Sequence, residues 1–501
     1  MRLSFEAPYF ILNCTFQERA VAKDNGFSWD TRFKRWATSS ALVAARLREY
    51  ADSSAKVQLQ RMLLEYAPWT GGFIEPKNDK LKPFQKDAAL FALSRNRSYL
   101  ALDPGLGKTP IAISISNQTR GQVVYICPPF LAYNTLEEFN RWNIHPERTA
   151  AIFSTGRPGI ECDFLIVPDT LLAKFALRQR EEYATLFVDE AHRFKNRTAS
   201  RTKQLLGGPI TPGLVSRFDR VVFLSGTPMP NRPIELYPIL SQAAPETIDF
   251  MSLFEYGARY CALFKGHWGW DFSGASDVAG LFKRIQGRFM LRVKKQDALP
   301  ELPDKLEEIV FIDKTLPPSI QALERKVLKD HSPEDLYHHS LSPHVASYRR
   351  EIGLLKLDPA CHYIKECLDG GDENLLVFAY HRDVIDGLAD QLSQYAPLVV
   401  TGDTTKEKRH EAVGAFQAAN GPRVFIGQIQ AAGIGFTLTR ATRVVFVEYS
   451  WVPGENSQAS DRAHRIGQKD FVNVQYLVFR NSIDRTVIET DLRKREIINQ
   501  L

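Results

Sequence analysis

Short runs of consecutive hydrophobic residues, separated by segments with helical periodicity, recur along most of the chain. One run at residues 98–102 is followed by others at 123–127, 164–167, 186–188 and 221–224. Runs that are apolar at every position are typical of parallel strands buried on both faces. The helical segments between them provide the crossover connections that parallel strands require. The pattern therefore predicts an α/β domain built on a parallel sheet.

A second set of apolar runs predicts another parallel sheet near the C-terminus. These runs are residues 375–379, 398–400, 424–426, 444–447 and 472–478. Short strand and turn signals predict a small α+β domain before the first sheet, with a helix near 39–50. We therefore predict four parts: residues 1–66, an α/β unit at 78–305 with a helical insertion at about 240–300, a helical connector at 306–372, and an α/β unit at 373–501.

Composition excludes few classes of protein. The chain has 501 residues, enough for about three domains. Its 64 basic and 58 acidic residues permit a nucleic-acid partner without requiring one. The six cysteines include no CxxC pair, which argues against a zinc site and a disulfide framework. No run reaches the ~18 apolar residues of a membrane span. We therefore expect a soluble intracellular protein with no membrane partner.

The turn after the run at 98–102 predicts a nucleoside-triphosphate site. It contains Gly105 and Gly107 and ends in Lys108 and Thr109 at the start of a predicted helix. Backbone N–H groups of such a turn surround phosphate oxygens, the lysine reaches the outer phosphates and the hydroxyl binds Mg²⁺. The general pattern has glycine where this chain has Leu102, so an ordinary glycine turn before a helix is the alternative.

An acidic pair after the run at 186–188 extends the predicted site. Asp189 is placed to hold Mg²⁺ beside Thr109, and Glu190 to activate the water that attacks the γ-phosphate. A lone acidic pair is more often a solvated turn, but its place after a buried strand favours the catalytic interpretation. Gln85, just upstream of the turn, has an amide that can satisfy both hydrogen-bonding edges of adenine.

The second α/β unit has no phosphate-binding turn of its own, so it is expected to supply groups to the first unit's nucleotide. Arg462 and Arg465 are three residues apart and are predicted to share one helix face. Guanidinium groups can stabilise the charge on a phosphoryl group during transfer.

Two clusters combine positive charge with features of nucleic-acid binding. Trp29 and Trp36 lie among Lys34 and Arg35, and rings can stack on bases while cations neutralise phosphates; alternatively, the rings form a small core. Three arginines recur every fourth residue and are predicted to share a helix face, either as a stripe that follows phosphates or as a solvated surface. They are Arg284, Arg288 and Arg292.

Six segments in sequence order resemble the motifs of Swi/Snf-type ATPases of helicase superfamily two. They are residues 103–109 (motif I), 128–142 (Ia), 189–196 (II), 224–231 (III), 431–439 (V) and 458–468 (VI). The resemblance implies two RecA-like lobes that use ATP and Mg²⁺, with a terminal brace helix after about residue 483. It also implies that Gly433 and Gln458 lie at the nucleotide. The residues that it implies at the DNA are Pro128, Asn134, Asp169 and Thr170.

Two segments resemble the annealing-helicase branch of that family. Residues 22–36 resemble the HARP domain, and the aromatic run at 268–274 resembles the branch's insertion. The resemblance implies a monomeric DNA-dependent ATPase that translocates on double-stranded DNA and remodels forked or branched DNA. It implies a location in the cytoplasm or nucleoid of a prokaryotic or virus-infected cell, or in a eukaryotic nucleus. The alternatives are a motor that displaces proteins such as polymerase from DNA, a non-catalytic DNA-structure-binding protein, and an RNA helicase.

Overall fold

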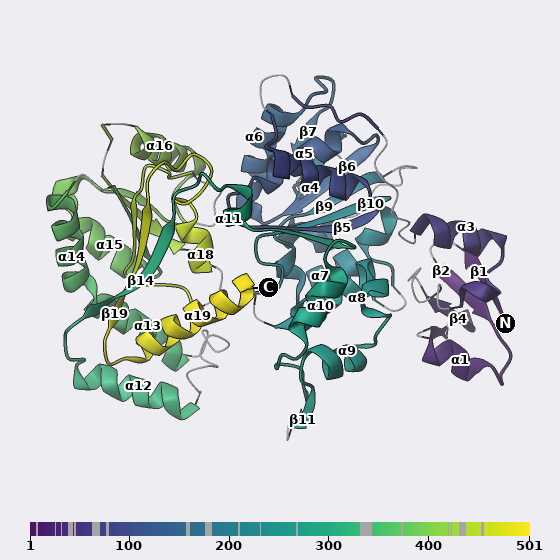
Figure 1. The fold of residues 1–501 in the computed structure, drawn as a ribbon. Coiled ribbons are helices and arrows are strands. Elements are labelled where there is room, and N and C mark those ends of the chain that lie inside the picture. The colour runs from purple at the N-terminus through teal and green to yellow at the C-terminus, as the bar shows by residue number, and fades with distance from the viewer. Residues whose placement is uncertain are drawn as a thin grey trace. The chain divides into compact units, whose positions relative to one another are not determined.

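The computed structural model divides the chain into two compact units, Met1–Ala298 and Leu299–Leu501. Figure 1 shows their helices and strands. The structure describes all residues other than 7–8, 26, 32, 39–43, 45–46, 63–70, 77–79, 157–160, 176–182, 209–210, 231, 267–268, 331–342, 372–373, 419, 422, 430–436, 452–454 and 501. Among the described residues, no helix is both long enough and apolar enough to span a membrane.

A small antiparallel sheet opens the first unit, with strand order β1-β2-β4-β3. The strands are β1 (Arg2–Glu6), β2 (Tyr9–Asn13), β3 (Ser28–Asp30) and β4 (Arg35–Thr38), accompanied by helices α1 (Arg19–Asp24) and α3 (Ser53–Met62). Leu3, Phe10 and Phe27 are buried between the sheet and the helices. These elements confirm a small N-terminal α+β fold. Most of the helix expected near 39–50 lies outside the described residues; Arg48–Tyr50 forms a 3-10 turn.

A seven-stranded sheet forms the centre of the first unit, in the order β13-β5-β10-β9-β6-β8-β7. Its strands are β5 (Arg97–Leu102), β6 (Gln122–Cys127), β7 (Ala150–Ile152), β8 (Phe164–Pro168), β9 (Tyr183–Val188), β10 (Arg220–Ser225) and β13 (Met290–Val293). Every neighbouring pair is parallel. All residues of β5 and β8 are buried, which explains their continuous apolar runs.

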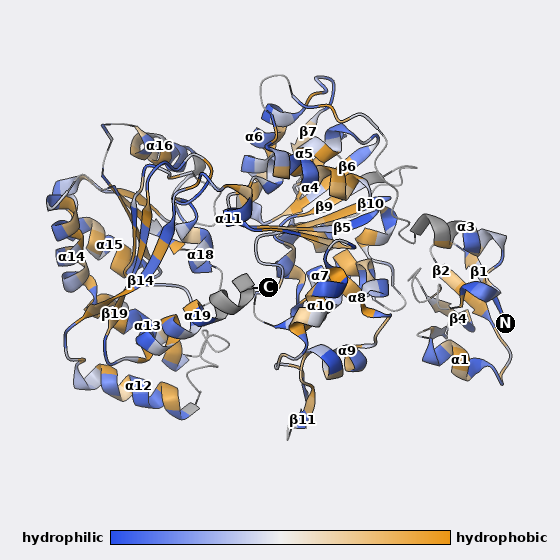
Figure 2. Cartoon of the chain, viewed as in Figure 1, coloured by the Kyte–Doolittle hydropathy of each residue, from blue (hydrophilic) through white to orange (hydrophobic). Residues whose placement is uncertain are grey.

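Helices cover both faces of this sheet (Figure 1). One face carries α4 (Pro83–Leu93), α5 (Lys108–Asn117) and α6 (Ala132–Trp142). The other carries α7 (Ser200–Leu206), α8 (Tyr237–Ala243) and α10 (Val278–Ile285). Hydrophobic residues are concentrated in the strands between the two layers (Figure 2). This is the predicted doubly covered parallel sheet.

The segment predicted as a helical insertion contains strands as well as helices. It includes the 3-10 turn η7 (Pro245–Ile248), α9 (Leu253–Tyr260), the hairpin β11 (Phe264–Gly266) and β12 (Gly269–Asp271), α10, and the short helix α11 (Lys295–Ala298). Strand β13 lies between α10 and α11 and joins the central sheet beside β5. The end of the segment is therefore part of the sheet itself.

The second unit contains a six-stranded parallel sheet in the order β14-β19-β18-β15-β17-β16. The strands are β14 (Lys305–Ile312), β15 (Leu375–Ala379), β16 (Leu398–Val400), β17 (Val424–Gln428), β18 (Arg443–Phe446) and β19 (Val472–Phe479). The helices are α12 (Pro318–Asp330), α13 (Pro343–Leu355), α14 (Leu357–Asp369), α15 (Arg382–Gln391), α16 (Lys406–Gln417), α18 (Glu455–Ser460) and α19 (Ile483–Gln500). The five predicted strands of this sheet are confirmed.

The start of the predicted helical connector differs from the structure. Strand β14 pairs with β19 over its whole length, from Lys305 with Val472 to Ile312 with Phe479. The run at 305–312 mixes acidic and apolar residues, and most of β14 is only partly buried at the sheet edge. It therefore lacks the continuous apolar pattern that identified the other strands. Helices α12, α13 and α14 form the rest of the connector, in which residues 331–342 lie outside the described part.

Candidate active site

The predicted phosphate-binding turn joins the C-terminal end of β5 to the first residue of α5, Lys108. Gly105 and Gly107 have φ of 88° and 77°, a conformation that favours glycine. A Cβ added to Gly107 would lie 2.4 Å from Gln85 Nε2. The N-terminal N–H groups of α5 therefore follow a tight turn without side chains in the way, as anion binding requires.

Two side chains hold this turn from within the unit. Lys108 Nζ donates to the carbonyl oxygen of Leu102 at 3.2 Å. Gln85 is 5% exposed; its Oε1 accepts from the Lys82 N–H at 2.8 Å and its Nε2 donates to Leu106 O at 3.0 Å. Gln85 therefore positions the turn directly. The amide oxygen has a second lone pair and the amide nitrogen a second hydrogen, and these can form the adenine contact that the sequence predicts.

The acidic pair follows β9, as predicted. Asp189 is 5% exposed; its Oδ1 accepts from the Glu190 N–H at 2.9 Å and its Oδ2 from the Tyr125 hydroxyl at 3.0 Å. The Thr109 side chain interacts with the same Tyr125 hydroxyl. One tyrosine therefore brings together the two predicted metal ligands. Tyr125 was not among the predicted residues; its only signal in the sequence is a single hydroxyl inside the apolar run at 123–127.

The electrostatics of Asp189 fit a cation site. Burial, followed by repulsion from Glu190, raises the pKa of Asp189 to about 6, although Lys108 lowers it. Asp189 forms no ion pair with a described residue. Mg²⁺ prefers oxygen ligands and is commonly held by one or two carboxylates together with substrate phosphates. Thr109 and Asp189 therefore match the donor set expected for Mg²⁺ bound to a nucleoside triphosphate.

Glu190 adopts a strained conformation beside a polar network. Its φ is 48°, which is uncommon for a residue other than glycine and is found at functional sites. Its Oε2 lies 3.3 Å from Nδ1 of His192, which is also 2.9 Å from the Ser225 hydroxyl. Because Ser225 ends β10, the predicted base is linked to the motif III segment. No sequence pattern predicted a role for His192 or Ser225.

The predicted groups of the second unit lie at the end of α18. Gln458 is on this helix, but the helix ends at Ser460, so Arg462 and Arg465 lie in the following turns. The prediction that they share a helix face is therefore wrong, because the chain leaves helical geometry between them and Gln458. Both arginines are partly exposed, and the Arg462 carbonyl accepts from the Leu438 N–H at 2.9 Å. Their role at the nucleotide stays a prediction, and Gly433 lies outside the described residues.

The residues predicted to contact DNA lie in motif Ia and at positions 169–170, and they differ in how exposed they are to solvent. Pro128 is buried at the end of β6, whereas Asn134 on α6 and Thr170 after β8 are accessible. Asp169 is 1% exposed, and its carboxylate accepts from Arg193 Nε at 2.7 Å. A direct DNA contact by Asp169 is therefore contradicted, because the side chain is used in an internal ion pair.

The predicted stripe of three arginines does not form. Helix α10 ends at Ile285, so only Arg284 is helical; Arg288 lies in a turn and Arg292 in β13. Arg284 pairs with Asp249 at 2.5 Å. Gln286 and the following glycine, which has a positive φ, end the helix and break the four-residue spacing. The prediction of a shared helix face is therefore wrong.

Arg292 has a different position from the one predicted. Its side chain is 10% exposed and pairs with Asp103, at the start of the phosphate-binding turn, at 2.5 Å. A contact with DNA phosphates is therefore contradicted for Arg292. It supports the nucleotide turn, a role that no local sequence signal indicated.

The N-terminal sheet presents exposed aromatic side chains. Trp29 on β3 and Trp36 on β4 are paired across the strands, with ring centroids 5.6 Å apart. Trp29 is 47% exposed and Phe33 is 56% exposed, so these two rings are not core residues. Lys34 is exposed, and Arg35 pairs with Glu6 at 2.6 Å.

Comparisons with known proteins agree with this geometry. The model of the SNF2-related domain matches residues 84–317, and that of the helicase conserved C-terminal domain matches residues 356–467. The chain is 33% identical over 421 residues to a protein of Xenopus tropicalis named SWI/SNF-related matrix-associated actin-dependent regulator of chromatin subfamily A-like protein 1; the match covers 81% of this chain and 43% of that protein. It is 31% identical over 444 residues to the mouse DNA annealing helicase and endonuclease ZRANB3, covering 83% of this chain and 40% of the relative.

The chain thus spans less than half the length of these two relatives. Among solved structures, the Sulfolobus solfataricus SWI2/SNF2 ATPase core in complex with dsDNA is 23% identical, with a TM-score of 0.40 and coverage of 86% of this chain and 95% of that one. The two matched domains cover the whole seven-stranded sheet and, apart from β19, the six-stranded sheet; they contain motifs I to III and V and all but the last residue of motif VI. The chain therefore belongs to the SNF2-related proteins that carry a helicase conserved C-terminal domain.

Proposed function

We propose that the chain hydrolyses ATP when it is bound to DNA, translocates on double-stranded DNA and remodels forked or branched DNA. The observation that supports this most is the convergence of Lys108, Thr109, Asp189 and Glu190 at the C-terminal ends of β5 and β9. They lie in a chain that also has a helicase conserved C-terminal domain. The proposed enzyme acts in the cellular compartment that contains the DNA.

Each residue of the site has a distinct task in the proposed reaction. The turn's N–H groups and Lys108 bind the phosphates of ATP, and Glu190 orients and deprotonates the attacking water. Thr109 and Asp189 would hold Mg²⁺, which would supply positive charge to neutralise the phosphates of ATP. Arg462 stabilises the charge that develops on the transferring phosphoryl group, together with Arg465.

Remodelling of branched DNA is the more specific part of the proposal. It is supported by similarity to relatives that include a protein named as a DNA annealing helicase. The N-terminal sheet adds the structure-sensing surface, because Trp29 and Phe33 are exposed beside Lys34. Rings at a DNA junction can stack on unpaired bases, and nearby cations neutralise phosphates.

The deciding experiment is a steady-state ATPase measurement on the full chain. Rates are compared without nucleic acid and with linear duplex, single-stranded DNA, forked DNA and RNA, at two salt concentrations. We expect forked DNA to stimulate most, with loss of stimulation at high salt as phosphate contacts weaken. Glu190→Gln should abolish turnover while ATP and DNA still bind, whereas the exposed control Glu147→Gln should keep full activity.

Other outcomes separate the alternatives. Equal stimulation by plain duplex would favour a motor that displaces proteins from DNA. Stimulation by RNA alone would overturn the assignment of DNA as substrate, and turnover by the Glu190→Gln variant would overturn the assigned base.

The N-terminal surface has its own test. Trp29→Ala should reduce the preference for forked over linear DNA and leave duplex-stimulated hydrolysis unchanged. Phe16, which is 75% exposed with Arg19 over its ring at 3.9 Å, provides a matched control in the turn between β2 and α1. An equal loss in Phe16→Ala and Trp29→Ala would show that the effect is not specific to the proposed surface.

A further inference from the structure

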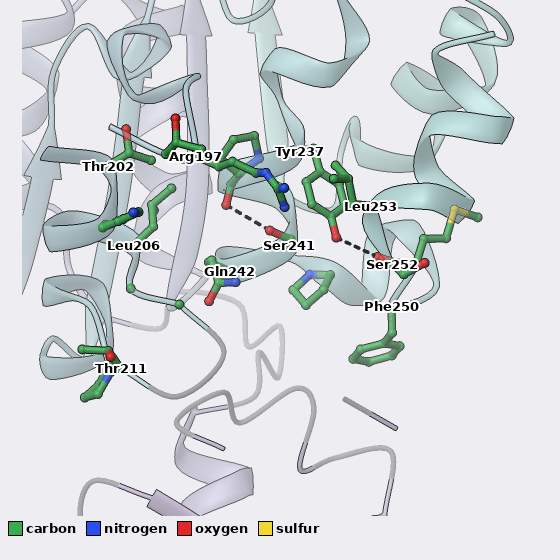
Figure 3. A pocket seen from close by; sticks show the side chains of 18 of the residues that line it. Arg197, Thr202, Leu206, Thr211, Tyr237, Ser241, Gln242, Phe250, Ser252 and Leu253 are labelled. Atoms are coloured by element: carbon green, nitrogen blue, oxygen red, sulfur yellow. Dashed lines mark hydrogen bonds between the residues drawn. The ribbon is translucent and has the colours of Figure 1, made fainter. Parts of the chain in front are cut away.

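A groove on the first unit has lining residues that begin at Arg197, directly after the motif II segment. Its volume is about 890 Å³, and it is lined by residues of α7, α8, η7 and α9 and the turns between them (Figure 3). Ligand-binding pockets commonly measure about 300–1,000 Å³. The groove is therefore large enough to bind a ligand, and no step of the proposed ATP reaction uses it.

The charges of the groove all have one sign. Its charged lining residues are Arg197 and Lys203, and none of the described lining residues carries a carboxylate. Both side chains are exposed, and neither forms an ion pair with another residue in the described part of the chain. In Figure 3 the Arg197 side chain extends between Tyr237 and Ser241. A hollow with two uncompensated cations attracts an anionic ligand.

The uncharged polar residues match a phosphate and sugar surface. They are Thr198, Thr202, Gln204, Thr211, Tyr237, Ser241, Gln242 and Ser252. Hydroxyl and amide side chains of this kind, with arginine and lysine, make most contacts to nucleic-acid backbones. Thr202 is 2% exposed, and its hydroxyl has no hydrogen-bond partner among the described residues.

An aromatic surface borders the groove. Phe254 lines it and is 49% exposed. Its ring lies 5.6 Å, centroid to centroid, from that of Trp270 on β12, which is 52% exposed. Exposed rings beside a basic groove form the kind of platform on which unpaired bases stack without regard to sequence.

We propose that this groove binds single-stranded DNA, with phosphates at Arg197 and Lys203 and a base on Phe254. The inference deepens the proposed function, on which it rests, because it assigns a site for the unpaired strand of forked DNA. The same cations would attract an acidic peptide. The side-chain hydroxyls, which suit contacts to a nucleic-acid backbone, and the exposed Phe254 ring favour a nucleic-acid strand instead.

Fluorescence anisotropy of the full chain without ATP tests the groove directly. The probes are a fluorescein-labelled oligothymidylate and a blunt duplex. The Arg197→Glu/Lys203→Glu double variant should bind oligothymidylate at least about tenfold more weakly, with a salt slope reduced by about 1.4, since each single-strand phosphate contact contributes about 0.7. Phe254→Ala should weaken binding about tenfold without changing the slope. Duplex affinity should change less than about twofold.

Arg120→Glu is a suitable control, because Arg120 is exposed in the turn between α5 and β6, far from the groove in sequence. An effect of Arg120→Glu equal to that of the Arg197→Glu/Lys203→Glu variant or of Phe254→Ala would overturn the inference. So would a wild-type chain that binds polyglutamate but not oligothymidylate. Absence of DNA-stimulated hydrolysis in the wild-type chain would instead overturn the proposed function, and the anisotropy measurement would still decide the groove.

Discussion

Arg292 joins the start of the phosphate-binding turn to its surroundings, and we expect its removal to weaken ATP binding. Its Nη2 lies 2.5 Å from Asp103 Oδ1, and its Nη1 donates to the Ala101 and Gly226 carbonyls at 3.1 and 3.4 Å. Asp103 Oδ2 also accepts from the Lys295 N–H at 2.8 Å. One ion pair therefore links the nucleotide turn, the motif III segment and the first residue of α11.

The burial of the pair sets the expected size of the effect. Removing one partner of a fully buried ion pair costs about 3–5 kcal/mol, whereas exposed pairs contribute about 0–1 kcal/mol. The Arg292 and Asp103 side chains are 10% and 23% exposed, between these limits. We therefore expect Arg292→Met to destabilise the bound form of the turn by about 2 kcal/mol. This corresponds to about a 30-fold weaker affinity for ATP.

Isothermal titration calorimetry with ATP and Mg²⁺ measures this affinity on the full chain. A second variant, Asp103→Asn/Arg292→Met, removes the carboxylate that the single substitution leaves without its cation. It should bind ATP about tenfold more tightly than Arg292→Met, because the two residues act as a pair. Arg480→Met is a matched control, since Arg480 pairs with Asp313 at 2.8 Å on the surface of the second unit.

Two results would refute the reasoning about Arg292. One is an ATP affinity of Arg292→Met equal to that of the Arg480→Met control. The other is a double variant that binds no more tightly than Arg292→Met, which would show that the uncompensated carboxylate is not the cause. Thermal melting without nucleotide shows whether each variant is folded, so that a general loss of structure is not mistaken for a loss of binding.

Three further predictions concern single residues. Gly107→Ala should abolish ATP binding in calorimetry, because φ is 77° and the new Cβ would lie 2.4 Å from Gln85 Nε2; retained binding would contradict the assigned turn. Arg97 is 9% exposed and donates to four backbone carbonyls, so Arg97→Met should lower the free energy of unfolding by at least about 3 kcal/mol in urea, and an unchanged midpoint would contradict this. The pKa of Asp189 is raised from 3.8 to about 6, so the folded chain binds more protons than the unfolded chain in this range. Without Mg²⁺ and nucleotide, the free energy of unfolding of the wild type relative to that of Asp189→Asn should therefore fall as the pH rises from about 4 to 6. If this difference in free energy did not change with pH, the carboxylate would not be held as described.

The parallel sheets could be predicted because their signal is local. Strands β5 and β8 are buried at every position, and their sequences are apolar at every position. Strand β14 was missed because it is an edge strand whose mixed sequence is typical of partial burial. Its place beside β19 depends on a segment more than 150 residues away, which no local pattern contains.

The nucleotide site was predictable for a related reason. Parallel strands end at one edge of a sheet, so motifs that follow the apolar runs must converge there. Lys108 and Asp189 are close enough to interact electrostatically, as this argument requires. Tyr125 connects Thr109 to Asp189 from within a strand, where the sequence pattern gives only the general expectation of a buried residue.

Charged residues were the least predictable, because their roles depend on partners that are distant in sequence. Equal spacing suggested one helix face for three arginines, yet Arg284 pairs with Asp249 and Arg292 with Asp103. Asp103 and Lys295, which meet at the start of α11, are 192 positions apart. A partly buried carboxylate at the nucleotide turn requires a compensating charge, and β13 supplies it by joining the sheet beside β5. The segment that sequence suggested would contact DNA therefore completes the sheet that carries the ATP site, and its last helix, α11, ends where the second unit begins.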